Sequence, residues 1–542
     1  MRRLVAVVLT AGLLAIPAVG DAGVPDDACD WISFRNGPHN HGASHCDGIG
    51  VTDVTTLVPA FLYRTRDSVT STPAVVDGVV YVGTWDGWVY AFDQPSGVGD
   101  PSLAEAGVPT VLPKWERQID DGNGVAFGRI VSSPAVIRLD GTPVVVIAGG
   151  ATVYALHGND GSVLAQLCLD PRSTGRCQGS DGDEIEVESS PVVVPDRDGG
   201  ADVMVGLDVH NGAGIGRTGV VRARLERDDA GWSLTPVWKF DPEAGEAYSG
   251  PDLLTRGSGT GGGCGGVWGT PAVDPASDLV VFGTASCSSG RPDPFVDAGE
   301  KVFAVRFTDG SRRWRYDPDR RQQGAHADDD FGAAVQLFDI ADRLVAGAGG
   351  KDGWYYAIDA ATGAEVWKTH VGQAGHLGED FAVGGIIGSP AVGEAGGKPA
   401  LFVTTAISTP FDDPPADDPG RMLSLHALDA ATGAVLWRQP LTRQTYGHPT
   451  YTNGIVLVPS TAGLSVQAFH ADTGAPLWSS PPLNGAPSSG VAVTEDAIYL
   501  GAGTRQSDAG FKLTGDDSVV AALVGADPQE RAAGVWGFRK GG

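Results

Sequence analysis

The segment KDGWYYAIDAATGAEVWKTHV, residues 351–371, predicts two short strands joined by a tight turn. The turn runs from Asp359 to Gly363, because an Asp side chain can bond the backbone two residues on and Gly accepts a positive φ without steric cost. The second strand carries Trp367, a large apolar side chain that a single hairpin cannot bury. The unit therefore has to pack against other parts of the chain.

The same hairpin recurs along the chain. Copies end at Trp437 and Trp478, a weaker copy ends at Trp314, and in another copy Ala165 stands in the Trp position. An apolar strand that usually begins Pro-Ala-Val precedes the hairpins. It is found at residues 71–84, 132–149, 189–206, 269–284 and 388–405. The two pieces give four short strands per repeat, and repeated four-stranded sheets are typical of a β-propeller.

The combination of Pro-Ala-Val with Ala-(Ile/Leu)-Asp-x-x-Thr-Gly-x-x-x-Trp resembles the pyrroloquinoline quinone (PQQ) repeat. Quinoprotein alcohol dehydrogenases carry this repeat, and so does the outer-membrane assembly lipoprotein of Gram-negative bacteria. The resemblance covers residues 57–525 and is nearest to the polyvinyl-alcohol-dehydrogenase branch. It implies an all-β fold, and counting the expected inner strands gives an eight-bladed propeller of four-stranded antiparallel blades. Because one fold hosts many functions, the repeat identifies the propeller better than the activity.

The chain divides into four expected segments. They are a signal peptide at 1–22, a lead-in at 23–56, the propeller at 57–525 and a C-terminal tail at 526–542. Residues 57–65, LVPAFLYRT, resemble an outer strand with Phe61 in the Trp position. The last repeat, from Ser488 to about Leu523, has three expected strands and lacks the fourth. The N-terminal strand should therefore complete that blade and close the ring, which removes exposed sheet edges.

The N-terminus has the pattern of a secretory signal. Arg2 and Arg3 form its basic region, and the apolar run from Leu4 to Val19 is short for a membrane span. The net charge of −28 argues against nucleic acid as a partner, because phosphate binding needs a basic surface. We therefore expect an exported monomer, secreted or periplasmic, without a membrane span.

Six cysteines in an exported chain predict disulfides. Six allow about 15 pairings, and the sequence does not choose among them. Pairing of neighbours would join Cys29 to Cys46, Cys168 to Cys177, and Cys264 to Cys287. The chain contains no CxxCH motif, so we expect no covalently attached haem c, and no paired CxxC motifs that would indicate zinc.

The expected long loops collect at one end of the blades, where the sites of a rigid scaffold usually lie. Four pieces there resemble quinoprotein dehydrogenases, namely residues 214–219, 259–274, 327–332 and 350–353. The resemblance implies that a Gly run including Gly263 lets the backbone approach a flat cofactor, and that Trp268 stacks on it. It also implies that Lys351 contacts the quinone carbonyls, with Arg217 and Asp330 in the adjoining loops.

Other positions depart from the family pattern. The resemblance places the catalytic Asp at Arg306, which leaves the catalytic residue unknown. It places the calcium-ligating Asn near Ala285 or Ser286, and the calcium-ligating Glu near Gly214. A calcium–PQQ site needs oxygen ligands and a base for the alcohol proton, so these changes weigh against catalysis.

Nearby acids could replace the missing calcium ligands. Asp328 and Asp329 are the expected metal ligands, with Asp330 and Asp208 as further sources of oxygen. The alternative is that these acids cap turns where loops meet strands. Lys351 has the same two interpretations, as a cofactor ligand or as a solvated loop charge.

Two functions remain open from the sequence. In the first, the protein is an exported PQQ-dependent dehydrogenase that oxidises an alcohol or polyol, with calcium as a further cofactor. In the second, it is a non-catalytic propeller that binds a protein, polymer or cell-wall ligand with its loop-bearing face. The changed Asp, Asn and Glu positions favour the second, whereas Lys351 and the Gly–Trp loop favour the first.

Overall fold

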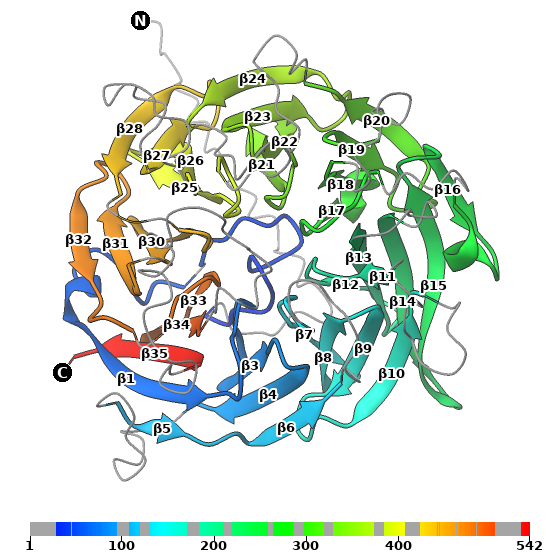
Figure 1. Ribbon diagram of the computed structural model, residues 1–542, viewed down its shortest axis with the longest axis horizontal. Coiled ribbons are helices and arrows are strands. Elements are labelled where there is room, and N and C mark those ends of the chain that lie inside the picture. Colours follow the sequence, from blue (N-terminus) through cyan, green and yellow to red (C-terminus); the bar gives the residue numbers. More distant parts are fainter. Residues whose placement is uncertain are drawn as a thin grey trace, which may run out of the picture.

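The computed structural model shows a closed ring of eight sheets around a central axis (Figure 1). It describes residues 29–44, 46–94, 108–119, 129–170, 184–210, 218–257, 264–286, 298–318, 329–372, 384–406, 423–441, 443, 445–461, 463–483, 485–503 and 533–541. The predicted all-β, eight-bladed propeller is confirmed. Within the described ranges, no helix is long and apolar enough to cross a membrane.

In each blade the strands follow one another from the axis outward, and neighbouring strands are antiparallel except for the two outermost strands of blade 8, which are parallel. Blade 1 contains β2 (Ala74–Val76), β3 (Val79–Gly83), β4 (Trp88–Asp93) and β6 (Trp115–Gln118). Blade 2 contains β7 (Ala135–Leu139), β8 (Thr142–Gly149), β9 (Thr152–His157) and β10 (Val163–Cys168). Blade 3 contains β12 (Val192–Pro195), β13 (Ala201–His210), β14 (Gly219–Asp228), β15 (Gly231–Asp241) and β16 (Glu246–Ser249), and β11 (Glu184–Glu186) also pairs with β13. Blade 4 contains β17 (Ala272–Asp274), β18 (Leu279–Gly283), β19 (Val302–Val305) and β20 (Arg312–Tyr316).

The other half of the ring repeats this arrangement. Blade 5 contains β21 (Gln336–Ile340), β22 (Arg343–Gly349), β23 (Trp354–Asp359) and β24 (Glu365–His370). Blade 6 contains β25 (Ala391–Ala395), β26 (Lys398–Thr404), β27 (Ser424–Asp429) and β28 (Val435–Pro440). Blade 7 contains β29 (Thr450–Thr452), β30 (Ile455–Ser460), β31 (Ser465–His470) and β32 (Pro476–Ser479). Blade 8 contains β33 (Val491–Val493), β34 (Ala497–Ala502), β35 (Gly534–Lys540), β1 (Leu57–Arg64) and β5 (Thr110–Val111). Three short 3₁₀ helices complete the described elements: η1 (Val54–Thr56), η3 (Leu253–Thr255) and η4 (Pro275–Ser277).

The N-terminal strand closes the ring, as the sequence predicts. Strand β1 pairs antiparallel with β35, from Leu57 opposite Lys540 to Arg64 opposite Gly534. The assignment of residues 526–542 to a tail is corrected by this pairing, because β35 is the third strand of blade 8. The physical reason is the apolar run around Trp536 and Phe538, both buried, which needs sheet partners. The third strand expected before residue 525 falls at 504–525, which lies outside the described residues.

The repeated Trp joins five of the eight blades to the next blade. In five blades its indole N–H donates to a carbonyl oxygen of the next blade, at 2.7 to 3.0 Å. The donor and acceptor pairs are Trp115–Gly158, Trp238–Phe307, Trp314–Ala360, Trp367–Ala430 and Trp437–Ala471. The ring also packs against the glycine of the neighbouring turn, where an added methyl group would come within 2.4 to 2.8 Å of it. The motif recurs because it buries the Trp between blades.

Hydroxyl groups link the starts of the inner strands around the axis. The backbone N–H of Thr72 donates to Ser133 Oγ at 2.8 Å, Ser133 N–H to Ser190 Oγ at 2.9 Å, and Ser190 N–H to Thr270 Oγ1 at 3.0 Å. Across the closure, Gly490 N–H donates to Thr72 Oγ1 at 3.0 Å. These bonds satisfy backbone groups that have no partner within their own sheets.

The lead-in crosses the middle of the ring (Figure 1). Its backbone bonds the inner strands of six blades, at Val75, Val136, Val273, Leu337, Val392 and Tyr451. Asn40 donates its side-chain amide to the carbonyls of Thr270, Pro271 and Val335 at 2.9 to 3.2 Å. The segment therefore covers inner sheet edges that would otherwise be unpaired.

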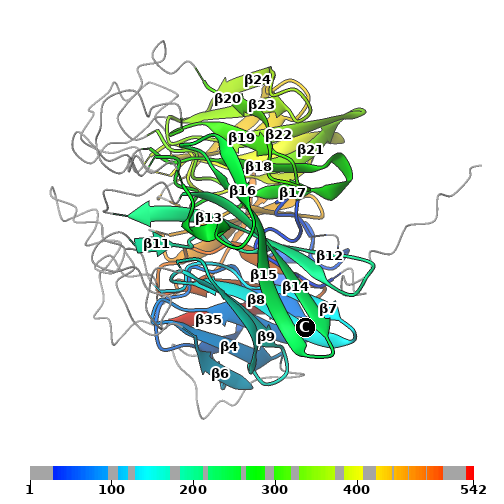
Figure 2. The same cartoon turned by 90° about the vertical axis from the view of Figure 1, so that its right-hand side faces the viewer.

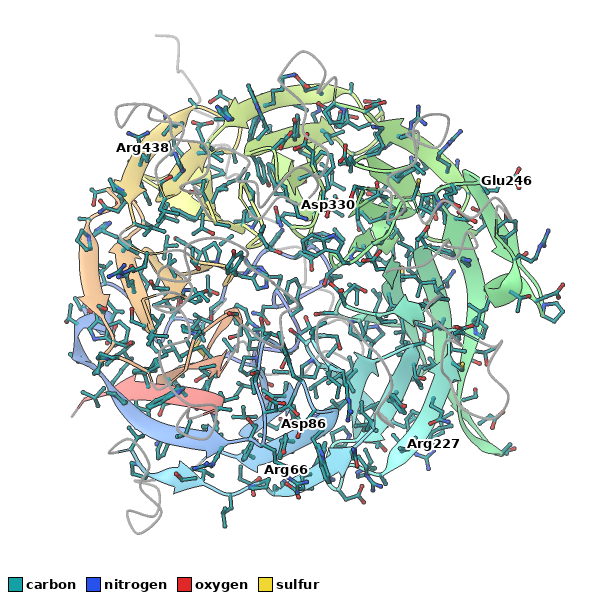
Figure 3. All side chains as sticks on the ribbon, viewed as in Figure 1. Arg66, Asp86, Arg227, Glu246, Asp330 and Arg438 are labelled. Carbon is teal, nitrogen blue, oxygen red and sulfur yellow. A yellow bond between two sulfur atoms is a disulfide. The ribbon has the colours of Figure 1, made fainter. Side chains whose placement is uncertain are left out.

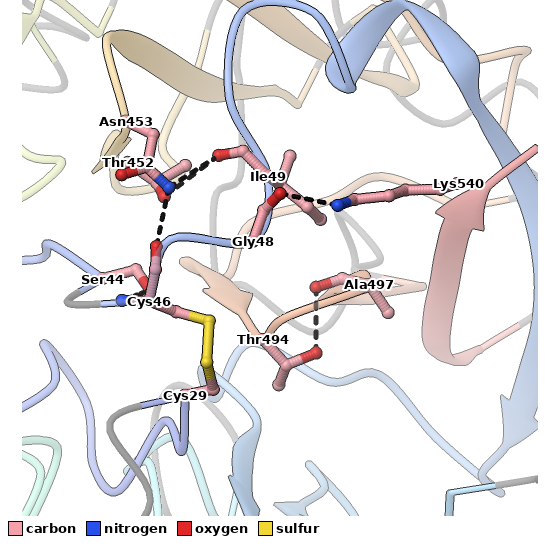
Figure 4. The surroundings of a disulfide bond; sticks show 10 residues. All are labelled: Cys29, Ser44, Cys46, Gly48, Ile49, Thr452, Asn453, Thr494, Ala497 and Lys540. Carbon is pink, nitrogen blue, oxygen red and sulfur yellow. Dashed lines mark hydrogen bonds between the residues drawn. A yellow bond between two sulfur atoms is a disulfide. The ribbon is translucent and has the colours of Figure 1, made fainter.

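A disulfide anchors the lead-in at its two ends. Cys29 and Cys46 are bonded, which confirms this predicted pair (Figure 4). The Cys46 carbonyl accepts from Asn453 Nδ2 at 2.6 Å, and the Gly48 carbonyl accepts from Lys540 Nζ at 2.6 Å. The lead-in is thus tied both to blade 7 and to β35 of blade 8.

The two ends of the ring carry different connections. At one end lie the turns between the second and third strands and the connections from each outer strand to the next inner strand; we call this the top face. The hairpins between the third and fourth strands lie at the opposite end. Figure 2 views the ring from its edge, where the long hairpin β14–β15 of blade 3 stands out.

Candidate functional site

A buried ion pair lies at the top face of blade 5. Lys351 is in the turn between β22 and β23, and its Nζ lies 2.8 Å from Asp330 Oδ2, with side chains only 10% and 7% exposed. Asp330 comes from the connection that leads into β21 and lies on the inner side of the ring (Figure 3). The backbone N–H of Lys351 also donates to the Asp330 carbonyl at 2.9 Å. Backbone and side chain together hold the two residues in contact.

The second carboxylate oxygen of Asp330 is also engaged. Oδ1 accepts a hydrogen bond from the backbone N–H of Ser286 at 2.6 Å, from the segment that follows β18. The family resemblance places a calcium-ligating Asn near Ala285 or Ser286, and here the main chain of Ser286 binds Asp330. A carboxylate that accepts a backbone N–H and faces an ammonium is stabilised in its ionised form.

Trp268 lies beside this pair. Lys351 Nζ is 5.6 Å from the centroid of the indole ring, within the range of a cation–π contact. The ring packs on Gly332, where an added methyl group would lie 1.6 Å from Trp268 Cζ2. Gly332 is therefore needed for the position of Trp268, which itself is only partly buried.

Hydrogen bonds from blade 3 hold the segment that ends at Trp268. Cys264 N–H donates to Glu243 Oε1 at 2.7 Å, and Thr218 Oγ1 donates to the Cys264 carbonyl at 2.8 Å. Val267 N–H donates to the Leu207 carbonyl at 2.9 Å. The indole is thus presented from a segment that is bonded on both sides.

Further acids lie close by. Asp208 is 6% exposed, and an added methyl group at Gly266 would lie 1.8 Å from its Oδ1. Asp329 is 1% exposed, and its N–H donates to Glu300 Oε1 at 2.8 Å. Nevertheless, in the described part of the chain no three His, Cys, Asp or Glu side chains form a group that could hold a metal.

Part of the predicted site lies outside the described residues: Gly263, Arg217, Asp328, Cys177 and Cys287. Cys168 and Cys264 are both disulfide-bonded. Their pairing with Cys177 and Cys287 stays a prediction.

Arg306 is remote from the ion pair. It follows β19, in the turn toward β20, and therefore lies at the end of blade 4 opposite the top face. Its Nη1 pairs with Asp278 Oδ2 at 2.9 Å, and its side chain is 49% exposed. A strand of four residues separates the two ends by about 13 Å at about 3.3 Å per residue. The missing Asp at this position therefore carries no information about a base beside Lys351.

Sequence reasoning identified Lys351, Asp330 and Trp268, and the structure brings them together. It missed Ser286 as a partner of Asp330, and it missed the support from Glu243 and Thr218. Ser286 contributes only its main chain, which no side-chain pattern reveals. Glu243 and Thr218 lie 21 and 46 residues from Cys264, without a spacing that would signal contact.

Comparison with known proteins decides the family. The family model described as "Glucose/ethanol/alcohol dehydrogenase, beta-propeller domain" matches residues 31–382. The chain belongs to this family. A second family model, described as outer membrane protein assembly factor BamB, matches residues 351–529 of the chain.

Curated relatives of this chain are distant. The chain is 25% identical to lupanine 17-hydroxylase [cytochrome c] of Pseudomonas sp over 368 residues, which cover 63% of this chain and 47% of the relative. It is 29% identical to polyvinylalcohol dehydrogenase of Sphingopyxis sp. (strain 113P3) over 245 residues, covering 40% of this chain and 35% of the relative. The matches thus span less than half the length of these relatives.

Solved structures share the fold of the dehydrogenase-type propeller. A europium-containing methanol dehydrogenase superposes with a TM-score of 0.65 at 16% identity, covering 95% of this chain and 98% of that chain. The quinohemoprotein alcohol dehydrogenase of Comamonas testosteroni superposes with a TM-score of 0.62 at 16% identity, covering 95% of this chain and 81% of that one. At these identities the likeness concerns the fold alone.

The site of this dehydrogenase-type propeller fits a quinone better than a calcium ion. Lys351 supplies a cation and Trp268 a partly exposed aromatic ring next to it. For calcium the described residues offer no group of three acidic or other ligand side chains, and Asp328 lies outside them. We therefore assign no step to calcium, and the metal role of Asp329 stays a prediction.

Proposed function

We propose that this protein is an exported PQQ-dependent dehydrogenase that oxidises an alcohol or polyol at the top face. The observation that carries the proposal is the contact of Lys351 with Asp330 and Trp268. Trp268 would stack against the cofactor, and Lys351 would bind its carbonyl oxygens. Bound PQQ would supply the quinone that accepts the electrons of the alcohol. Membership of the dehydrogenase family supports this choice of chemistry.

The ion pair suggests how the chain's own groups would act. A cation at the quinone oxygens stabilises negative charge that develops on reduction. When Lys351 turns toward the ligand, its ion pair with Asp330 Oδ2 is broken, whereas Oδ1 keeps the Ser286 N–H. Asp330 would then hold an oxygen ready to accept the hydroxyl proton of the substrate, in place of a base at position 306.

The proposed substrate class rests on the names of the relatives. Polyvinylalcohol dehydrogenase and methanol dehydrogenase act on hydroxyl groups by name, and lupanine 17-hydroxylase is a third relative with an oxidative name. An alcohol or polyol is the substrate class common to the two dehydrogenases. The individual substrate does not follow from these similarities.

Titration of the purified full-length protein with PQQ tests the proposal. Calorimetry and Trp fluorescence should both show saturable binding. Lys351→Ala should weaken that binding by about ten- to a hundredfold, equivalent to about 1.5–3 kcal/mol for a charge-assisted hydrogen bond. Trp268→Phe should reduce the fluorescence change more than the calorimetric affinity, since the aromatic ring remains.

Lys301 provides the matched control. Its side chain is 8% exposed and its Nζ pairs with Asp317 Oδ1 at 3.0 Å, so Lys301→Ala also removes a buried paired lysine. PQQ affinity should stay unchanged in this variant and in Arg306→Asp. If the native protein binds no PQQ and a dye-coupled alcohol assay stays flat, with and without calcium, the dehydrogenase proposal is wrong.

The second candidate function is a non-catalytic propeller that binds a protein, polymer or cell-wall ligand. The match of residues 351–529 to the assembly-factor model favours it. Absence of PQQ binding, together with capture of a defined ligand by the native protein, would support this function over the first.

Export is the third part of the proposal. The Cys29–Cys46 disulfide and the basic and apolar pattern at the N-terminus support it. N-terminal sequencing of the protein from its native host should find cleavage close to residue 22. A cytoplasmic protein that retains Met1 would contradict export.

A further inference from the structure

Arg35 is a completely buried cation in the lead-in, with 0% exposure. Its Nη2 donates to the Pro390 carbonyl at 2.7 Å, at the start of the inner strand of blade 6. Among the described residues, Nε and Nη1 have no hydrogen-bond partner and no carboxylate pairs with the guanidinium. Burial is the cause that lowers its pKa, to about 9, so Arg35 stays charged at neutral pH.

Such a charge needs a counter-charge. An unpaired ion in an apolar interior is very costly, so buried charges in proteins are paired. Arg222 shows the usual solution in the same ring: its Nη2 lies 2.9 Å from Asp202, and its Nε donates to that carboxylate at 2.9 Å. Arg35 lacks an equivalent carboxylate among the described residues.

His448 adds a second donor next to Arg35. Its Nδ1 accepts the backbone N–H of Ser389 at 2.8 Å, which assigns the ring proton to Nε2. No described residue accepts a hydrogen bond from Nε2, and the ring is only partly buried. Burial, and then the charge of Arg35, lower the pKa of His448 to about 3, so the ring is a neutral donor at neutral pH.

The two side chains belong to the same place in the fold. Ser389 bonds His448 and its neighbour Pro390 bonds Arg35, at the inner starts of blades 6 and 7. Phe34 packs edge-on against His448 with ring centroids 5.0 Å apart. Arg35 Nε, Arg35 Nη1 and His448 Nε2 are all donors, so the chemistry is that of an anion site.

Gly42 bounds the space on one side of the guanidinium. The backbone of Gly42 lies directly against the guanidinium, since an added methyl group there would come within 1.8 Å of Arg35 Nη2. Gly42 has a φ of 59°, in the turn that folds the lead-in back over Arg35. On this side the backbone of Gly42, and not a ligand, packs against Arg35, so a small anion is the simplest occupant of the remaining donors.

We propose that a small monovalent anion of the size of chloride binds near the propeller axis between Arg35 and His448. It would neutralise the buried guanidinium and fasten the lead-in to the inner strands of blades 6 and 7. This site is separate from the one at Lys351, and its test does not depend on PQQ binding.

Thermal unfolding in chloride and in gluconate at equal ionic strength tests the proposal. Chloride should raise the unfolding midpoint saturably, because a ligand that binds only the folded state stabilises it by mass action. Gluconate should not, since it is too large. Arg35→Met should abolish the difference between the two salts. Arg222→Met, which removes an arginine already paired with Asp202, should retain it.

Bromide replaces chloride as a direct probe. Crystals of the native protein soaked in bromide should show an anomalous peak beside Arg35, a result that does not depend on whether Arg35→Met folds. Arg35→Lys should keep the salt effect but require several-fold more chloride, since it retains the charge and loses the planar fork. No peak beside Arg35, equal midpoints in the two salts, or an undiminished chloride effect in Arg35→Met would each overturn the proposal.

Discussion

Gly363 offers a sharp test of how the repeat holds the ring together. It has a φ of 75° in the turn of blade 5, and an added methyl group would lie 2.8 Å from Trp314 Cγ and Cδ2 of blade 4. Gly141 is its matched control: its φ is also 75°, but an added methyl group would meet nothing within 4 Å. Substituting alanine at both positions therefore separates backbone strain from contact with the Trp.

The expected magnitudes differ. Alanine in the left-handed region costs about 1–2 kcal/mol, which both variants share. Gly363→Ala adds overpacking against a buried ring, worth about 1–3 kcal/mol. We therefore expect Gly141→Ala to lower the free energy of unfolding by about 1–2 kcal/mol, and Gly363→Ala by about 2–5 kcal/mol. Urea unfolding of each variant, followed by circular dichroism, measures the difference.

A double-mutant cycle shows whether Trp314 causes the excess. In the Trp314→Ala background, the cost of Gly363→Ala should fall toward that of Gly141→Ala, because the ring atoms at 2.8 Å are gone and only the contact with Cβ, at 2.9 Å, remains. Equal effects of the two glycine variants in the native background would refute the reasoning. So would an excess that is undiminished when the indole ring is removed.

Three further predictions address the site, the lead-in and acid stability. Gly332→Ala should displace the Trp268 ring and weaken PQQ binding at least about tenfold, whereas Gly537→Ala, whose nearest contact would be an ordinary 3.4 Å, should leave the calorimetric affinity unchanged. The double substitution Cys29→Ser and Cys46→Ser should lower the free energy of unfolding, measured with urea, by about 2–3 kcal/mol for a sequence separation of 17 residues, and an unchanged free energy would contradict this. The interaction of Asp274 with His39 lowers the pKa of that carboxyl to about 2, below the unfolded value of about 3.9. The stabilisation from ionised Asp274 is therefore complete above the unfolded pKa and is lost as the pH falls toward 2. Asp274→Asn should lower the free energy of unfolding in urea by up to about 1–2 kcal/mol near pH 6, and by less near pH 3. An equal loss at both pH values would contradict this.

The sequence alone determined the propeller and its closure. The Asp-x-x-Thr-Gly turn and the following Trp are local patterns, and each predicts a hairpin regardless of the rest of the chain. Since the Trp needs a neighbour to cover it, repetition of the hairpin predicts a ring of blades. The strand left over at 57–65 could pair only with the incomplete last blade, which the structure confirms.

The candidate site could be predicted only in part. Family resemblance identified Lys351, Trp268 and Asp330, which lie 83 residues apart at most, but not that Lys351 and Asp330 form an ion pair. The same resemblance placed a catalytic Asp at Arg306, which the topology puts at the other end of its blade. A motif match assigns a residue to a strand, whereas the direction of that strand in the ring decides which face it reaches.

Only the tertiary structure decided how the two ends of the chain are used. Residues 534–540 become the third strand of blade 8, although the repeat pattern ends before them. The lead-in bonds the inner strands of six blades, and this places Arg35 in the interior beside His448. These contacts join segments separated by hundreds of residues, so they follow from the closed geometry of the ring rather than from any local pattern. The backbone groups at the inner edges of the blades need partners, and the chain that crosses the axis is the one that can supply them.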